Sequence, residues 1–211
     1  MSNCKPLSTH ISTSQNLSKI MRPQNETEIK EMESIPYAQV VGSLMFAMTS
    51  TRLNICHAVG LVSRYQSNPE KKHWQAVKRI FRYLQGNKNI KLCFGLSDLK
   101  IAGYIDADFA SDANDRQSTS GYVFQFGGTT ISWSSTKQNC VPKSTMKAEY
   151  ISCSTTVSNV AWIGRFTESL NLGILNRLVN VFCDIKSAIS LIKSRAYSSK
   201  GKHIDMNYHY I

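Results

Sequence analysis

Four acidic residues, in four separate segments of the sequence, have the side-chain chemistry that a pair of divalent cations requires. Mg²⁺ prefers oxygen ligands and keeps several of its waters, so carboxylates from different elements suit it, with Mn²⁺ as an alternative. Two such ions can activate a water and stabilise the leaving oxygen of a phosphodiester. Taken singly, each acid could instead form a turn or a cap. The four are Asp106 in GYIDADFASD, Glu149 in MKAEY, Asp184 in VFCDIKSA and Asp205 in KHIDMNY.

The position of Glu149 within its segment is the main reason to connect these acids. Apolar side chains follow it at steps of four, four and three, namely Cys153, Val157 and Val160. This spacing is that of one helix face, and we expect the face to point toward a core. A carboxylate in such a place is costly unless it meets a cation or a metal. The sequence therefore predicts that Glu149 faces inward and has a cationic partner.

Asp106 and Asp184 are predicted to lie at the ends of two strands. From about residue 92 the apolar residues alternate with a period of two, which is typical of strands, over 100–107, 120–127, 129–135 and 179–184. If the first and fourth strands are neighbours, Asp106 and Asp184 lie at the same edge of the sheet. Gly127-Gly128 predicts a hairpin turn between the second and third strands.

Two helices complete the predicted order of elements. A long helix runs from Ser144 to about Leu170, and a short one from about Lys186 to Ser194. The stretch KHID, which holds Asp205, forms a last strand or a loop. The order is then β-β-β-α-β-α-β. Three antiparallel strands followed by a helix crossover imply an α/β fold with a mixed sheet and flanking helices.

A small helical segment is predicted before the sheet. Between residues 34 and 86 apolar residues recur at steps of three and four, which indicates three helices. Pro69 suits the start of the third helix and Gly86-Asn87 suits its end. Residues 1–33 are rich in Ser, Thr, Asn and charge, and we interpret them as a flexible lead-in. The predicted domains are therefore 1–33, 34–91 and 92–211.

The charge of the chain indicates an anionic partner. Twenty-five Lys and Arg face fourteen Asp and Glu, for a formal net charge of +11. Such an excess favours nucleic acid, although a generally basic surface is the alternative. Lys71, Lys78 and Arg82 lie at steps of seven and four on the third predicted helix, opposite much of its apolar stripe. They could track phosphates in a groove, or they could form a solvated helix face.

The sequence also bears on the compartment. None of the six cysteines forms a CxxC pair or a zinc-like spacing, so we expect buried free thiols in a reducing compartment. The first twenty residues lack the apolar core of a signal peptide, and no run of eighteen apolar residues predicts a membrane span. We expect an intracellular protein, in the cytoplasm or the nucleus, that does not engage membranes. The oligomeric state stays open.

Several blocks of the sequence resemble one known family. GYIDADFASDANDRQSTSGYVFQFGGTTISWSSTKQ, AEY, VFCDIKSAI and KHIDMNYHYI resemble, in that order, the ribonuclease H (RNase H) domain of Ty1/copia retrotransposon Pol polyproteins. Upstream, PYAQVVGSLMFAMTSTRLNICHAVGLVSRYQSNPEKKHWQAVKRIFRYLQG is similar to the segment that joins reverse transcriptase to that domain. The resemblance covers roughly residues 36–211.

The resemblance implies an RNase H-like fold and metal-dependent cleavage of RNA within RNA–DNA hybrids by two ions. By position, Asp106 is the first-strand ligand, Glu149 the helix ligand, Asp184 the fourth-strand ligand and Asp205 the last. Discrimination for RNA would come from contacts to the 2′-hydroxyl. Because the family continues beyond the position of Ile211, we expect a domain truncated at its C-terminus. Polymerase activity is not predicted, since YIDAD has Ala107 where the reverse-transcriptase motif YxDD has its last Asp.

Departures from the family keep two further functions open. Lys147 stands where the family has the Glu of a capping box, and CDIKSA replaces CDNQSA. A cation two residues from Glu149 would oppose metal binding, which leaves a non-catalytic remnant that binds nucleic acid as one alternative. The other is a co-opted protein, such as a secreted RxLR-like effector that modulates host cell death. Arg82-Tyr83-Leu84-Gln85 resembles a degenerate RxLR motif, although helical periodicity also explains these residues.

Overall fold

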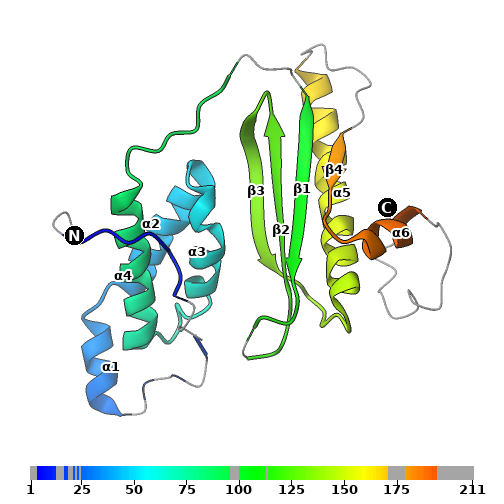
Figure 1. Cartoon of the computed structure of the whole chain (residues 1–211). Helices are drawn as coiled ribbons and strands as arrows, with labels where there is room; N and C mark the ends of the chain where they lie inside the picture. Colours follow the sequence, from blue (N-terminus) through cyan, green and yellow to red (C-terminus); the bar gives the residue numbers. More distant parts are fainter. Residues whose placement is uncertain are drawn as a thin grey trace. The chain divides into compact units, whose positions relative to one another are not determined.

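The structure is a computed structural model that describes residues 4–12, 17–18, 21, 23, 25–95, 100–112, 114–170 and 179–193. The chain divides into two compact units, Met1–Lys91 and Leu92–Ile211. Unit 1 is helical, and unit 2 contains a sheet with a long helix beside it (Figure 1). The predicted α/β class, with a mixed sheet after a small helical segment, is confirmed at this level. Among the described residues, no helix has the length and apolar character needed to cross a membrane.

Unit 1 is built from helices that share one apolar core. They are α1 (Glu26–Glu33), α2 (Tyr37–Ser50), the 3₁₀ turn η1 (Leu53–Ile55), α3 (Cys56–Ser63) and α4 (Lys71–Gly86). Helix α3 contacts both α2 and α4. The core contains most of the apolar residues whose spacing predicted the three helices after residue 34, among them Val41, Leu44, Ile55, Val59, Val62 and Val77, whereas Met45 is exposed. The helical prediction for this segment is confirmed.

Helix α1 lies within the segment that the sequence indicated as a flexible lead-in. Asn25 caps it, because its side-chain oxygen accepts a hydrogen bond from the backbone N–H of Glu28 at 3.0 Å. Two acids in the first turn, Glu26 and Glu28, suit the positive end of the helix dipole. Met32 and Leu17 are buried in the core of unit 1. One buried position in a two-turn helix gives too little periodicity for the sequence to reveal it.

Unit 2 contains a four-stranded mixed sheet. Its strands are β1 (Ile101–Asp108), β2 (Thr119–Phe126), β3 (Thr129–Lys137) and β4 (Asn180–Phe182), in the spatial order β3-β2-β1-β4. β2 runs antiparallel to both β1 and β3, whereas β4 runs parallel to β1. Gly127 and Gly128 connect β2 to β3 with φ angles of 56° and 77°. Only glycine adopts two such angles in succession easily, so the predicted hairpin turn is confirmed.

Helix α5 (Thr145–Ser169) packs along β1, and the short helix α6 (Lys186–Lys193) contacts α5 (Figure 1). Alternate residues of β1 are buried, from Ile101 to Ala107, which is the period that predicted the strand. Ile101, Phe124 and Ile163 form the buried centre between sheet and helix. The predicted last strand or loop at KHID lies outside the described residues.

Candidate metal centre

The register between β1 and β4 brings Asp106 and Asp184 to one end of the sheet. Tyr104 lies opposite Phe182 in this parallel pair, and the two rings stack with centroids 5.2 Å apart. Parallel strands advance together, so Asp106 and Asp184 each follow two residues later at a similar level. Both side chains are exposed. The condition under which the sequence places both acids at one edge, that the first and fourth strands are neighbours, is therefore met.

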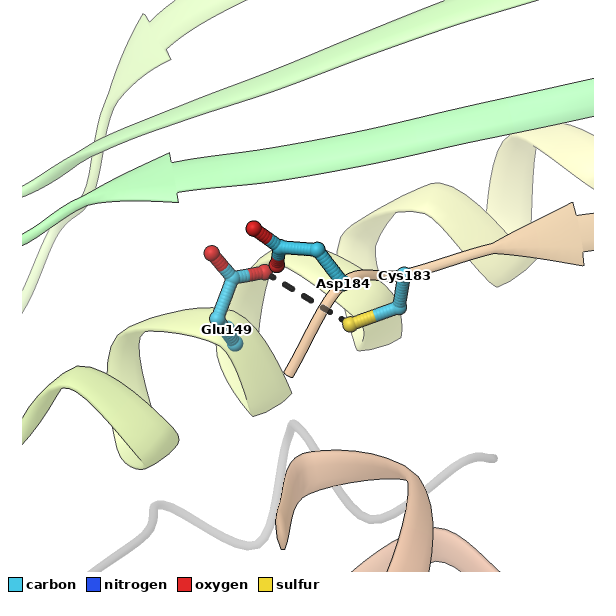
Figure 2. A group of neighbouring side chains, drawn as sticks. All are labelled: Glu149, Cys183 and Asp184. Carbon is cyan, nitrogen blue, oxygen red and sulfur yellow. Dashed lines mark hydrogen bonds between the residues drawn. The ribbon is translucent and has the colours of Figure 1, made fainter. Parts of the chain in front are cut away.

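Glu149 comes from the second turn of α5 and is 1% exposed. The helix begins at Thr145 because Ser144 caps it, accepting a hydrogen bond from the backbone N–H of Lys147 at 3.3 Å. The Oε1 atom of Glu149 accepts a 2.8 Å hydrogen bond from the backbone N–H of Ala107. Its Oε2 atom lies 3.8 Å from the Sγ atom of Cys183, which donates to it (Figure 2). The inward orientation predicted for Glu149 is present.

The electrostatic surroundings of Glu149 favour a neutral or metal-bound carboxyl. Burial raises the pKa of Glu149, and the negative charges of Asp106 and Asp184 raise it further, against the hydrogen bond from Ala107. In the described part of the chain no Lys or Arg forms an ion pair with Glu149, Lys147 included. A buried carboxylate beside two other acids lacks a counter-charge. A bound cation would supply it.

Three side chains converge closely enough to share one ion. One ligand atom each from Glu149, Cys183 and Asp184 lies within 4.8 Å of the others (Figure 2). Asp106 is not in this group, although its charge acts on Glu149 and its neighbour Ala107 binds that carboxylate. Asp205, the fourth predicted ligand, lies outside the described residues. The structure thus brings together two of the predicted acids, with the third adjacent.

Sequence reasoning missed Cys183 and two residues that hold the site in place. The sequence alone predicts no role for the Cys183 thiol in a site. Because β4 ends at Phe182, strand alternation does not direct the side chains of Cys183 and Asp184 to opposite faces. Its position directly before Asp184 was the available signal. Ser152 donates to the backbone oxygen of Asp106 at 3.1 Å. The buried Gln138 amide donates to Ser120 Oγ at 2.8 Å and to the Ala148 oxygen at 2.9 Å.

The other two acids of GYIDADFASD have structural partners. Asp108 accepts hydrogen bonds from the backbone N–H of Thr119 and from the Ser111 hydroxyl, both at 2.6 Å. Asp112 is 7% exposed and pairs with Lys137 at 2.9 Å. Their carboxylates fix the loop that follows β1. Asp108 and Asp112 therefore have structural roles in this loop.

The predicted phosphate-binding residues of α4 differ in their surroundings. Lys71 forms an ion pair with Glu31. Arg82 donates from Nε to the backbone oxygen of Lys5 at 2.8 Å, and its own backbone oxygen accepts from the N–H of Leu7. Lys78 is exposed, and no hydrogen bond or ion pair of its side chain is present among the described residues. Phosphate contact by these three residues stays a prediction. Of the three, Lys78 has the side chain with the fewest interactions among the described residues.

No family model matches the chain, and no solved structure matches it at a significant level. All of the chain aligns with the Retrovirus-related Pol polyprotein from transposon TNT 1-94 of Nicotiana tabacum, at 47% identity and over 16% of that protein. The polyprotein from transposon RE2 of Arabidopsis thaliana is 34% identical, again over the whole chain and 14% of that protein. The chain thus spans about a sixth of these relatives' length.

A shorter relative is matched over nearly all of its length. Secreted RxLR effector protein 161 of Plasmopara viticola is 41% identical over 133 residues, which is 63% of this chain and 94% of that protein. Identity at this level over most of the relative places it and the chain in one family. Together with the polyprotein matches, these similarities show that the chain belongs to the family of Ty1/copia-type retrotransposon Pol polyproteins, as a segment of such a protein.

Proposed function

We propose that unit 2 is a metal-dependent ribonuclease of the RNase H type, which cleaves RNA in RNA–DNA hybrids. The observation that carries this proposal is the buried Glu149 carboxylate, which lies beside the acids at the ends of β1 and β4 and has no basic partner among the described residues. Support for the fold assignment comes from the order β1-β2-β3-α5-β4-α6 with β4 parallel to β1, which matches what the sequence resemblance implies.

The donor set fits a hard divalent cation. Asp106, Glu149 and Asp184 offer carboxylate oxygens, the ligands that Mg²⁺ and Mn²⁺ prefer, and the resemblance adds Asp205 as a fourth. When bound, two such cations supply an activated water and stabilise charge on the leaving oxygen of the phosphodiester. This assignment accounts for the burial of Glu149, whose carboxylate has no counter-cation within the described ranges of the chain.

The protein groups around these acids hold them in position. The N–H of Ala107 fixes one oxygen of Glu149, and the Ser152 hydroxyl binds the backbone oxygen of Asp106. Gln138 joins the end of β3 to the first turn of α5, directly before Glu149. Rigid placement of this kind matters because metal-ligating carboxylates are oriented by their own hydrogen bonds. These contacts keep the helix acid level with the strand acid.

The substrate proposed for this site is a polyanion. A net charge of +11 attracts a nucleic acid toward a local group of carboxylates, and Lys78 on α4 offers an exposed cation for a phosphate. Contacts to the 2′-hydroxyl would separate RNA from DNA. Such a substrate places the protein inside the cell, in the cytoplasm or the nucleus.

The test is Mg²⁺-dependent cleavage of an end-labelled RNA–DNA hybrid by the full chain. Asp106→Asn and Glu149→Gln should each lower the rate on the order of 100-fold or more, because each removes a ligand charge. Glu168→Gln is the matched control, since Glu168 is exposed near the other end of α5. Wild-type cleavage no faster than that of Asp106→Asn refutes the enzyme. Salt-sensitive hybrid binding without cleavage would instead support a non-catalytic nucleic-acid-binding remnant.

A second candidate function is an effector role in host cells. The similarity to Secreted RxLR effector protein 161 favours it, because nearly all of that protein is matched. The tetrapeptide Arg82 to Gln85 does not carry this candidate, since it lies within α4 and Tyr83 accepts a hydrogen bond from Asn54 at 2.8 Å. Expression in leaf cells, with host cell death as the readout, tests it. Equal effects of wild type and Asp106→Asn would separate this role from hydrolysis, and no effect would refute it.

A further inference from the structure

We propose that Glu149, Cys183 and Asp184 form a site for a thiophilic divalent cation, Zn²⁺ in particular, which excludes the hard cations from the proposed ribonuclease centre. The site deepens the proposed function because it regulates the same carboxylates, and only its inhibitory consequence rests on that function. Cation binding itself follows from the geometry of these three side chains. Cys183 is not among the oxygen ligands proposed for Mg²⁺.

The spacing of the donors suits zinc. Typical distances of about 2.3 Å from zinc to sulfur and about 2.0 Å to a carboxylate oxygen place two tetrahedral ligands about 3.5 Å apart. The Sγ atom of Cys183 lies 3.8 Å from Oε2 of Glu149, close to that value without any ion. One ligand atom of Asp184 lies within 4.8 Å of both (Figure 2). Small side-chain shifts are enough to close the three donors around one ion.

The carboxylate of Glu149 supplies an independent reason for a cation at this place. Its side chain is 1% exposed, and the N–H of Ala107 satisfies only Oε1. In the described part of the chain, no donor other than the Cys183 thiol reaches Oε2. The Oε2 atom of this nearly fully buried carboxylate therefore lies beside the other two donors, and none of the basic groups that the structure describes balances its charge. This is the setting in which a bound ion stabilises the folded chain.

The thiol decides which ion is preferred. Mg²⁺ takes oxygen ligands and keeps its waters, whereas thiolate ligands select softer ions such as Zn²⁺. On binding, the thiol of Cys183 loses its proton to solvent and the sulfur forms the metal bond. The ion also takes oxygens from Glu149 and Asp184. Because both carboxylates belong to the proposed Mg²⁺ centre, occupancy by Zn²⁺ excludes the hard cations there and stops hydrolysis.

Cd²⁺ titration of the full-length, reduced chain tests the site directly. Cd²⁺ stands in for Zn²⁺ because its bond to a thiolate has an ultraviolet charge-transfer band. Wild type should bind one equivalent whose band is lost in Cys183→Ser. Glu149→Gln should weaken that binding at least about tenfold, in the range seen when one group of a metal site is altered. Cys140→Ser is the matched control, since Cys140 is also a partly exposed free cysteine, and it should retain the equivalent.

Two outcomes overturn the proposal. An unchanged band in Cys183→Ser means that other cysteines bind the ion. Equal affinities in wild type and Glu149→Gln mean that a thiol alone binds it adventitiously. Retained Mn²⁺ binding by Cys183→Ser, with an unchanged circular dichroism spectrum, shows that a lost band is not due to unfolding.

The failure of this inference and that of the ribonuclease function are distinguishable. The Cd²⁺ band requires no substrate, so a chain that shows the expected band but never cleaves a hybrid retains the thiophilic site and loses the enzyme. The converse result is that the wild type and Cys183→Ser both cleave hybrids and are inhibited by Zn²⁺ at equal concentrations. That result retains the enzyme and refutes the thiophilic site. The expected result is that Cys183→Ser needs at least about tenfold more Zn²⁺.

Discussion

The backbone N–H of Ala107 donates a 2.8 Å hydrogen bond to Oε1 of Glu149. Ala107 directly follows Asp106 in β1, so this bond fixes the acid of α5 beside the acid of the strand. The bond also crosses from helix to sheet at the point where the Ser152 hydroxyl binds the backbone oxygen of Asp106. Helix and strand are thus tied together twice at the proposed site, and neither tie depends on a metal.

Glu149→Gln should make the metal-free chain more stable. The glutamine side chain keeps an oxygen for the N–H of Ala107 but has no charge to desolvate or to repel Asp106 and Asp184. In EDTA at neutral pH we expect a gain of about 1 kcal/mol, the low end of the cost of burying a polar group without full compensation. Because the folded-state pKa of Glu149 is raised, the wild-type deficit shrinks as pH falls through that pKa. Urea unfolding of both proteins at neutral pH and at a lower pH measures this difference in stability. A Glu149→Gln variant that is less stable than wild type at neutral pH would contradict the prediction.

Gly103→Ala should destabilise unit 2, because the ring of Phe124 in β2 packs against the backbone at this position. A Cβ atom here would lie 2.7 Å from Cε1 of Phe124, whose side chain is fully buried. Overpacking of this kind costs about 1–3 kcal/mol. Gly164→Ala is the matched control, since a Cβ atom added there meets no neighbouring atom within 4 Å. Alanine at this helical position should stabilise the protein by up to about 1 kcal/mol. Equal thermal stabilities of the two variants would refute this packing.

His73 should make unit 1 less stable in acid. Its ring is fully buried, stacks on Tyr65 at 3.9 Å and accepts the Glu70 N–H at 3.0 Å, so only the neutral form fits. Burial lowers the pKa of His73 despite the nearby charge of Glu70. A lowered folded-state pKa means full stability above about pH 6.5, the unfolded value, and a loss as pH falls toward the folded-state pKa.

His73→Gln tests this dependence, because glutamine keeps a capping-box acceptor and does not titrate. Hydrogen exchange of the α4 amides, corrected for intrinsic rates, should show protection falling from pH 7 to about pH 5 in wild type. The fall should be smaller in His73→Gln. His10, whose pKa is also lowered by burial, accounts for what remains. Identical pH profiles in the two proteins would exclude His73 as the source.

Lys78 should be the α4 cation that contributes most to hybrid binding. Its side chain is exposed, whereas Lys71 pairs with Glu31 and Arg82 holds the segment around Lys5. For a true phosphate contact, Lys78→Ala should lower the slope of log affinity against log salt by about 1. Binding measured in EDTA over a range of salt gives this slope. Lys71→Ala serves as the matched variant, and a larger change there would reverse the assignment.

Local patterns predicted much of the fold. Period-two runs and Gly127-Gly128 predicted three antiparallel strands. The apolar helix face that contains Glu149 predicted that this acid is buried. Contacts between distant segments were not predictable, because no local period records them. Arg82, for example, binds the backbone of Lys5 across 77 positions of sequence. Cys183 was missed for a related reason, since the predicted strand extended through residue 184 and alternation then directs Cys183 away from Asp184.

Mn²⁺ binding to the full chain, measured by electron paramagnetic resonance, tests most directly whether carboxylates from β1, α5 and the end of β4 hold one cation centre. Wild type should bind Mn²⁺, and Asp106→Asn, Glu149→Gln and Asp184→Asn should each weaken binding at least about tenfold. Cys183→Ser and Glu168→Gln should bind as wild type does. Wild-type affinity in Asp106→Asn and Asp184→Asn would contradict the account, because the acids that the fold places together would then not act on the same ion.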